Sequence, residues 1–214
     1  INDEPFHLAA VNSVITPLGI PEVPASYWKT ECVGLRLADT LPKIVNDGLR
    51  PADYERIILE YLNAFKGLVR GRAREIARDG VLDFIGHLAK NRKRMAVATS
   101  ARKDLAYAIL GPDGLDIWNV FEKIVTGDMI PKGLGKPKPD TYRLACPEGL
   151  RPYQCVAFED AGPGVESAYG AEMPVIAYPS EFTDHHDFGN AVYVVDNLTR
   201  AAKIIRHGRR PDVL

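Results

Sequence analysis

From residue 80 onward, short apolar runs rich in β-branched residues alternate with stretches of helical periodicity, and this alternation restricts the possible folds more than any other feature of the chain. Apolar runs of this length are typical of buried strands, and helices between them bring successive strands side by side in the same direction. The sequence therefore predicts an α/β fold with a Rossmann-like parallel sheet and right-handed crossovers. The predicted strands lie in KRMAVATS (93–100), EKIVTG (122–127), QCVAFED (154–160), MPVIAYP (173–179) and AVYVVD (191–196).

The N-terminal third of the chain contains helical patterns and no strand-like alternation. The strongest pattern is PADYERIILEYLNAFKGLV (51–69), for which Asp53 is predicted as the N-cap. A length of 214 residues is enough for one or two domains. We therefore expect a helical domain over residues 1–74 and an α/β core domain over residues 75–214. The weaker helical patterns cover residues 4–19, 27–34 and 37–48.

The overall charge offers no general attraction to nucleic acid or to an anionic membrane. The formal net charge is -1 and the pI is about 6.6. Basic residues cluster in VRGRAR (69–74), NRKR (91–94) and HGRR (207–210), but such runs are more often solvated surface than binding patches. No apolar run reaches the roughly 18 residues of a membrane-spanning helix. We expect neither a nucleic-acid partner nor a membrane partner.

The three cysteines, Cys32, Cys146 and Cys155, are widely spaced and form no CxxC motif. This pattern is typical of buried thiols in a reducing cytoplasm, rather than of disulfides or a zinc site. We therefore expect a cytoplasmic protein. The sequence carries no signal for a strong oligomer, so we expect a monomer or a weak homo-oligomer.

Polar residues follow the first predicted strand. Ligands of parallel α/β sheets bind at the carboxyl ends of the strands. The run KRMAVATS ends in Thr99 and Ser100, and the helix that follows carries Arg102 and Lys103. Hydroxyls, backbone N–H groups and a cation at a helix start are suited to hold an anion such as phosphate. The alternative is that Thr99 or Ser100 only caps this helix.

Two adjacent carboxylates, Glu159 and Asp160, follow the buried strand in VAFED. Paired carboxylate oxygens are the ligands that Mg²⁺ prefers, so these two residues are the candidate metal ligands. The alternative is that one of them caps the next helix, but capping accounts for only one of the two acids.

Lys136 lies between these strands in GLGKPKPD, where Gly135 and Pro137 restrict the loop around it. A lysine held in this way can direct its point charge at a phosphate, although most lysines are solvated surface. Asp140, a few residues later, is predicted to cap the following helix.

The order of these motifs along the chain resembles the haloacid dehalogenase superfamily of phosphoryl-transfer enzymes. The resemblance covers nearly the whole chain. The placement of the helical segment is similar to that in the branch that contains small-molecule phosphatases and β-phosphoglucomutase, in which an α-helical cap is inserted into the core. It implies a HAD-like core and places EPFH at the start of the cap. The motifs that carry it are EPFH, ATSARKD, VTGDMIPKGLGKPKPD, FEDAGPGVESA and AVYVVD.

In this superfamily the first core strand ends in Asp-x-Asp-Gly-Thr-Leu or a close variant, just before a segment like IxxEPxH. The resemblance therefore implies a nucleophilic aspartate and an acid/base aspartate on a central strand, between the strands equivalent to 94–99 and 154–159. Removing a central strand would leave backbone groups of two strands without partners. We expect such a strand to precede Ile1; the alternative is a degenerate, inactive homologue.

The resemblance implies a Mg²⁺-dependent phosphatase that acts on a small phosphorylated metabolite, a sugar phosphate, through an aspartyl-phosphate. By motif match, Asp160 binds the metal with Glu159 as a direct or water-mediated partner, and Thr99 binds a phosphoryl oxygen. Lys136 neutralises the developing charge. Further candidates are Ser100 and Arg102 for phosphate, and His7 and Arg36 for the substrate.

Three other functions stay open: a β-phosphoglucomutase-like phosphotransferase, a dehalogenase and a non-catalytic binding protein. The acidic pair and Lys136 disfavour the dehalogenase, because they suit metal-assisted work on phosphate. Two residues depart from the pattern of the resemblance. Glu172 stands where relatives have a helix-ending glycine, and Ala161 stands where they have a serine. A glutamate in the left-handed conformation would cost about 1 kcal/mol.

Overall fold

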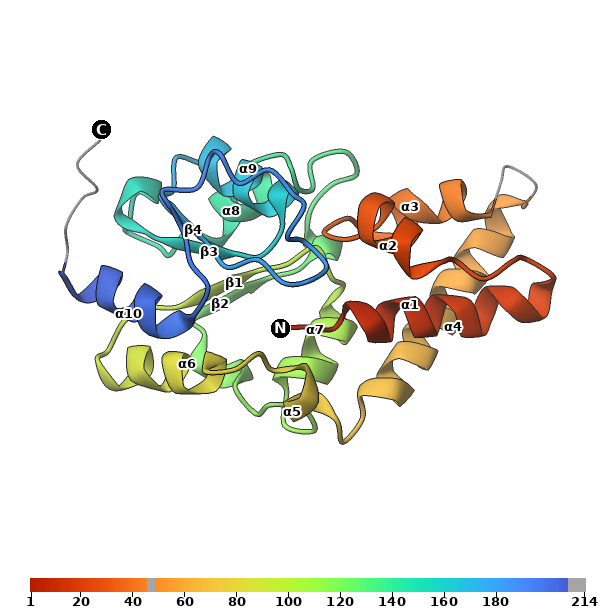
Figure 1. The fold of residues 1–214 in the computed structure, drawn as a ribbon, viewed down its shortest axis with the longest axis horizontal. Helices are drawn as coiled ribbons and strands as arrows, with labels where there is room; N and C mark the ends of the chain where they lie inside the picture. Colours follow the sequence, from red (N-terminus) through yellow and green to blue (C-terminus); the bar gives the residue numbers. More distant parts are fainter. Residues whose placement is uncertain (46–48, 208–214) are drawn as a thin grey trace.

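The computed structural model describes residues 1–45 and 49–207 and consists of a helical part and an α/β part (Figure 1). The ends of two predicted features, residues 46–48 of the third helical pattern and residues 208–210 of the basic run HGRR, lie outside the described residues. No helix in the described ranges combines the length and the apolar character that crossing a membrane requires.

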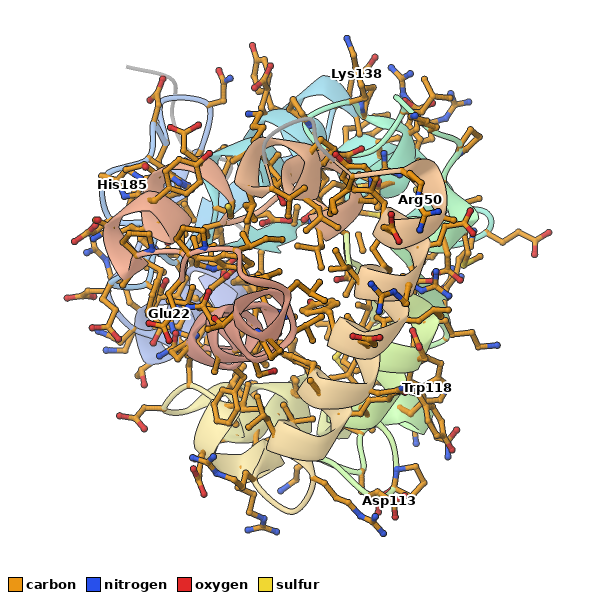
Figure 2. The ribbon with its side chains drawn as sticks, turned by 90° about the vertical axis from the view of Figure 1, so that its right-hand side faces the viewer. Glu22, Arg50, Asp113, Trp118, Lys138 and His185 are labelled. Atoms are coloured by element: carbon orange, nitrogen blue, oxygen red, sulfur yellow. The ribbon has the colours of Figure 1, made fainter. Side chains whose placement is uncertain are left out.

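Helices α1 to α5 form the helical part, at the right and lower centre of Figure 1. Their core consists of side chains that point inward from α1 and α4, among them Ile15, Ile57 and Phe65, each at most 1% exposed. Helix α4 begins at Pro51, directly after its N-cap Arg50, which is labelled in Figure 2. The bounds are α1 Glu4–Ile15, α2 Ala25–Glu31, α3 Leu37–Ile44, α4 Pro51–Val69 and α5 Ala73–Ile76.

The prediction of Asp53 as the N-cap of α4 is wrong, although the helix itself spans the predicted residues. Proline is accepted at the first position of a helix because it needs no N–H partner there, so α4 starts at Pro51 after Arg50. Asp53 is the third helical residue, and its Oδ2 accepts the backbone N–H of Arg50 at 3.3 Å. It therefore fills the acidic position of a capping box.

All five predicted strands exist, and all pair in parallel, which confirms the α/β class. Five helices connect or flank them, mostly where the sequence predicted helices. The prediction of Asp140 as a cap is wrong: the N-cap of α8 is Pro139, and no side chain caps that helix. The bounds are α6 Val81–Lys90, β1 Ala96–Ala98, α7 Lys103–Leu110, β2 Lys123–Val125, α8 Asp140–Ala145, β3 Ala157–Glu159, α9 Gly162–Gly170, β4 Val175–Ala177, β5 Tyr193–Val194 and α10 Leu198–His207.

Within the described residues, the strands form two sheets. Strand β1 pairs with β2, and β3, β4 and β5 form the second sheet in that order. Among the residues that the structure describes, no strand pairs with the second edge of β1 or of β3. These are the two strands between which the family resemblance places its central strand.

Helices cover both faces of the second sheet. Successive side chains of a strand point to opposite faces. In β4, Val175 and Ala177 pack with Val165 of α9, whereas Ile176 packs with Phe84 of α6 and with residues of α10. This arrangement explains why β4 is apolar throughout its length and appears in the sequence as a continuous run of apolar residues.

The division at residue 74 stays a prediction. Helix α5 runs across it, and the hydrophobic cluster of the helical part also contains Leu105 and Ile109 of α7. The α/β part therefore shares buried surface with the helical part at α7.

Glu172 has a φ of 64°, which is the left-handed conformation expected at this position. We predict that Glu172→Gly raises the free energy of unfolding by about 0.5–1 kcal/mol, because glycine adopts this conformation without steric conflict. Urea denaturation would measure the change. The matched control is Glu166→Gly, at an exposed position inside α9, which should lower stability by about 1 kcal/mol. Equal losses in both variants would contradict the prediction.

Candidate functional site

A cavity of about 550 Å³ lies between the helical part and the carboxyl ends of strands in both sheets. All eight residues that the sequence singled out line this cavity, so the fold brings together positions that are up to 153 residues apart (from residue 7 to residue 160). Their individual roles stay predictions. The eight residues are His7, Arg36, Thr99, Ser100, Arg102, Lys136, Glu159 and Asp160.

Lys136 connects the two sheets. Its ammonium donates to the backbone oxygen of Ala98, at the carboxyl end of β1, at 3.0 Å, and to the carboxylate of Glu159, at the end of β3. The two side chains are only 9% and 7% exposed. A buried charge needs a partner of opposite charge, and these two groups are each other's partners. The predicted alternative of a solvated surface lysine is therefore wrong.

The Glu159 carboxylate is held by further contacts. The hydroxyl of Tyr142, on α8, donates to Oε1 at 2.5 Å. Burial, together with the neighbouring Glu159 charge, raises the pKa of Tyr142, so this phenol remains a donor. A Cβ added to Gly164 would lie 2.0 Å from Oε2 of Glu159. Only glycine at this position lets the first turn of α9 approach the carboxylate, which explains one glycine of AGPGVE.

Asp160 is the unpartnered member of the acidic pair. Burial and then the adjacent Glu159 charge raise the pKa of its carboxyl. No described residue donates a hydrogen bond to the Asp160 side chain or forms an ion pair with it. The N-cap of α9 is Ala161 and no side chain caps this helix, so the capping alternative for both acids is wrong. A partly buried carboxylate beside another carboxylate is a suitable ligand for a hard cation such as Mg²⁺.

The described residues fit a metal ion only as part of a ligand set. Within residues 1–45 and 49–207, no group of three or more His, Cys, Asp or Glu side chains could hold a metal ion. Glu159 and Asp160 would supply carboxylate oxygens, and Mg²⁺ commonly takes its remaining ligands from water and from a phosphate.

Thr99 lies just beyond β1, and its Oγ1 accepts the backbone N–H of Ala101 at 3.0 Å. The proton of this hydroxyl remains available to an acceptor in the cavity. Helix α7 has Arg102 as its N-cap and no side-chain cap, so the alternative that Thr99 or Ser100 caps it is wrong. The Arg102 side chain is 52% exposed and lies 3.6 Å from Asp104.

Sequence reasoning missed Asp128, which also lines the cavity. Its Oδ1 accepts the backbone N–H of Lys103 at 2.9 Å and so links the segment after β2 to the start of α7. Its place directly after VTG, at the end of a predicted strand, was the available signal.

Arg36 reaches from the start of α3 toward the loop that carries Lys136. Its Nε donates to Asp39 at 2.7 Å, and a Cβ added to Gly135 would lie 3.5 Å from its Cζ. The Arg36 side chain is 20% exposed. Arg36 is therefore not a solvated surface residue, because its guanidinium packs against the α/β part beside the site.

His7 lies in a polar cluster on α1 and α4. Its Nε2 pairs with Oδ2 of Asp3 at 3.2 Å, its Nδ1 lies 2.6 Å from the oxygen of Tyr61, and its ring stacks on Phe65 at 4.2 Å. Burial opposes the charged form, but the charge and hydrogen bond of Asp3, together with the charge of Glu4, raise the pKa of His7. These contacts hold the imidazole firmly.

Glu4 lines the cavity beside this cluster and was also missed. The indole N–H of Trp28 donates to its Oε2 at 2.8 Å. Burial is the main reason why the pKa of Glu4 rises to about 7. Because the pKa depends on surrounding packing, EPFH in the sequence gave no sign of it.

Comparison with known proteins gives one family. The family described as haloacid dehalogenase-like hydrolase matches residues 9–171. Protein CbbY of Rhodobacter capsulatus is 34% identical over 125 residues, which are 58% of this chain and 54% of that protein. Fructose-1-phosphate phosphatase YqaB of Escherichia coli is 37% identical over 86 residues, 40% of this chain and 44% of that protein. The matches thus span about half the length of these relatives.

A solved structure extends the similarity over most of the chain. The crystal structure of CbbY from Rhodobacter sphaeroides in complex with xylulose-1,5-bisphosphate superposes with a TM-score of 0.81 at 26% identity. The superposition covers 91% of this chain and 88% of that one. The α/β core and the helical part therefore both have counterparts in a solved relative.

We predict that Glu4→Gln stabilises the protein at pH 8 but not at pH 4. The folded-state pKa of about 7 lies above the ordinary value of 4.5, so stability falls as the pH rises between these values and the penalty is complete above pH 7. The amide removes this penalty and can still accept the Trp28 N–H. The expected gain at pH 8 is about 1–3 kcal/mol by urea denaturation. The control is Glu22→Gln in the exposed loop after α1; a gain for Glu4→Gln that is the same at both pH values would contradict the prediction.

Proposed function

Since this chain belongs to the haloacid dehalogenase-like hydrolases, we propose that it is part of a Mg²⁺-dependent phosphomonoesterase whose substrate is a small phosphorylated metabolite, a sugar phosphate. One observation carries the proposal: an unpartnered Asp160 carboxylate lies beside the Lys136–Glu159 pair, at the carboxyl ends of strands from both sheets. The bisphosphate bound to CbbY and the name of YqaB support a sugar phosphate as the substrate class.

Asp160 and Glu159 would hold Mg²⁺, which when bound supplies positive charge to the phosphoryl group. Thr99 would donate its hydroxyl proton to a phosphoryl oxygen, since its oxygen already accepts the Ala101 N–H. The Lys136 ammonium, already fixed by Ala98 and Glu159, would neutralise charge that develops on the phosphoryl oxygens. A fixed ammonium needs no reorganisation during the reaction, and this favours catalysis.

The attacking group would stand on a strand outside the described residues that pairs with β1 and β3. Each of these strands has an edge without a strand partner among the described residues, and Lys136 joins their carboxyl ends. A carboxylate at the end of such a strand would attack phosphorus and form an aspartyl-phosphate while the ester P–O bond breaks, and a second side chain, in its protonated carboxylic acid form, would give its proton to the oxygen of the leaving alcohol. Water would then cleave the acyl phosphate, releasing phosphate.

The helical part would act as a cap that covers the substrate and excludes water. It contributes His7, Glu4 and Arg36 to the cavity wall. The predicted cytoplasmic location belongs to the same proposal and is supported by the three free thiols.

Replacing the proposed metal ligand gives the first test. In the full-length protein, Asp160→Asn should lower Mg²⁺-dependent phosphate release from sugar phosphates at least about 100-fold. Mg²⁺ should also stop raising the thermal midpoint, because binding to the folded state is lost. The control is Asp113→Asn, at the lower edge of the molecule in Figure 2. Full activity of Asp160→Asn at saturating Mg²⁺ would exclude the ligand role.

The same assay separates the other functions. Phosphate release by the unaltered protein supports a phosphatase. Conversion of a sugar phosphate to its isomer without release would instead show a mutase. Binding of sugar phosphates without either reaction would show a non-catalytic protein.

A second test concerns substrate choice. Arg36→Met keeps an apolar stem and removes the charge beside Gly135. If Arg36 binds a second anionic group, KM for a sugar bisphosphate should rise about 10- to 100-fold. This rise corresponds to the free energy lost with one charge-assisted hydrogen bond. KM for the corresponding monophosphate should change much less. Arg56→Met, on the 53% exposed Arg56 of α4, is the control; an equal rise for both substrates would contradict the assignment.

A further inference from the structure

Two cysteines that lie nine positions apart in the sequence meet in the structure. The sulfur atoms of Cys146 and Cys155 are 3.9 Å apart. Both residues are half-buried and therefore within reach of a small reagent. The third cysteine, Cys32, is buried in the core of the helical part, at 4% exposure.

The fold holds the two thiols together through the segment that separates them. Cys146 directly follows α8, and Cys155 precedes β3 by two residues. The segment turns back on itself through the Leu150 N–H, which donates to the Pro147 oxygen at 3.1 Å. Each thiol also contacts a carbonyl of this segment: Cys146 that of Leu150 at 3.5 Å and Cys155 that of Arg151 at 3.9 Å. Both side chains are thus directed over the same short loop.

We propose that Cys146 and Cys155 are a redox pair that closes to an intramolecular disulfide when the protein meets a small disulfide oxidant such as glutathione disulfide. One thiolate attacks the oxidant, which breaks its S–S bond, forms a mixed disulfide and releases one glutathione thiolate. The second cysteine thiolate then attacks the protein sulfur of the mixed disulfide and releases the second glutathione thiolate. Two cysteine thiols are oxidised, one glutathione disulfide is reduced, and two protons pass to the released thiolates.

The pair can close by local side-chain motion. A disulfide needs the sulfurs at about 2.05 Å. A rotation of about 30° at χ1 displaces a sulfur by roughly 0.9 Å, which is about half of the difference between the two separations. Cys146 follows α8 and Cys155 precedes β3, so neither cysteine lies within the helix or the strand. Glu159 on β3 and Tyr142 on α8 should therefore keep their contact in the oxidised form.

Closure should be slow at neutral pH. Burial, followed by the nearby Cys146, raises the pKa of Cys155 to about 11, so little thiolate forms at pH 7. Because the thiolate is the attacking species, the rate should increase up to about tenfold for each pH unit between pH 7 and pH 9. Cys32 should stay reduced, since its thiol is enclosed by the helical core.

The disulfide would link the end of α8 covalently to the segment just before β3. Closing a short loop restricts the unfolded chain, so the oxidised protein should unfold at a temperature about 3–6 °C higher than the reduced protein.

The test is incubation of the folded chain with glutathione disulfide at pH 8.5, followed by denaturation, alkylation and mass analysis. The expected result is one alkylated cysteine, Cys32, and a peptide map that links Cys146 to Cys155, with the higher unfolding midpoint. Three alkylated cysteines, a persistent glutathione adduct on both residues, or a link between two chains would overturn the proposal. A disulfide between Cys146 and Cys155 without a rise in the unfolding midpoint would contradict the predicted stabilisation.

Two serine variants make the test specific. Cys32→Ser should close and gain stability like the unaltered chain. Cys155→Ser should retain a glutathione adduct or a free thiol at Cys146 and show no rise in the midpoint. Closure that requires Cys32 would contradict the assignment of the pair.

Discussion

The buried pair of Lys136 and Glu159 is the interaction on which the site depends. An ammonium and a carboxylate taken out of water are unfavourable unless each finds partners of the right kind. Ala98 at the end of β1 and Tyr142 on α8 provide them, together with the space left by Gly164. Because Ala98 ends a strand of the first sheet and Glu159 ends a strand of the second, Lys136 also links the two sheets where their strands end.

The charged groups on the cavity wall bear on the metal ion proposed for this site. Lys136 is matched by Glu159, and the adjacent Asp160 carboxylate has no cationic partner among the described residues. On the opposite wall, Asp3 is matched by His7, whereas burial raises the pKa of Glu4 to about 7, so that this carboxyl is about half protonated at that pH. The proposed Mg²⁺ would place positive charge beside the Asp160 carboxylate.

Local features were predictable from the sequence because they depend on near neighbours in the chain. The five strands and helix α4 follow from apolar periodicity, whereas the left-handed Glu172 was suggested only by the family resemblance, in which relatives have glycine there. Caps were predicted less well. Asp53 and Asp140 lie inside their helices because the prolines just before or at the helix start determine where the first turn begins. Propensity alone does not distinguish the cap from the third helical position.

The sequence by itself determined the α/β class, the order of the strands along the chain and the polar residues at their ends, since each is written in a short stretch of residues. Only the tertiary structure decided which of these residues meet. It placed Arg36 of the helical part against Gly135, enclosed Glu4 beside Trp28, and brought Cys146 within 3.9 Å of Cys155. Distances across the fold and the desolvation of a carboxyl depend on packing between segments far apart in the chain, and no local pattern records that packing.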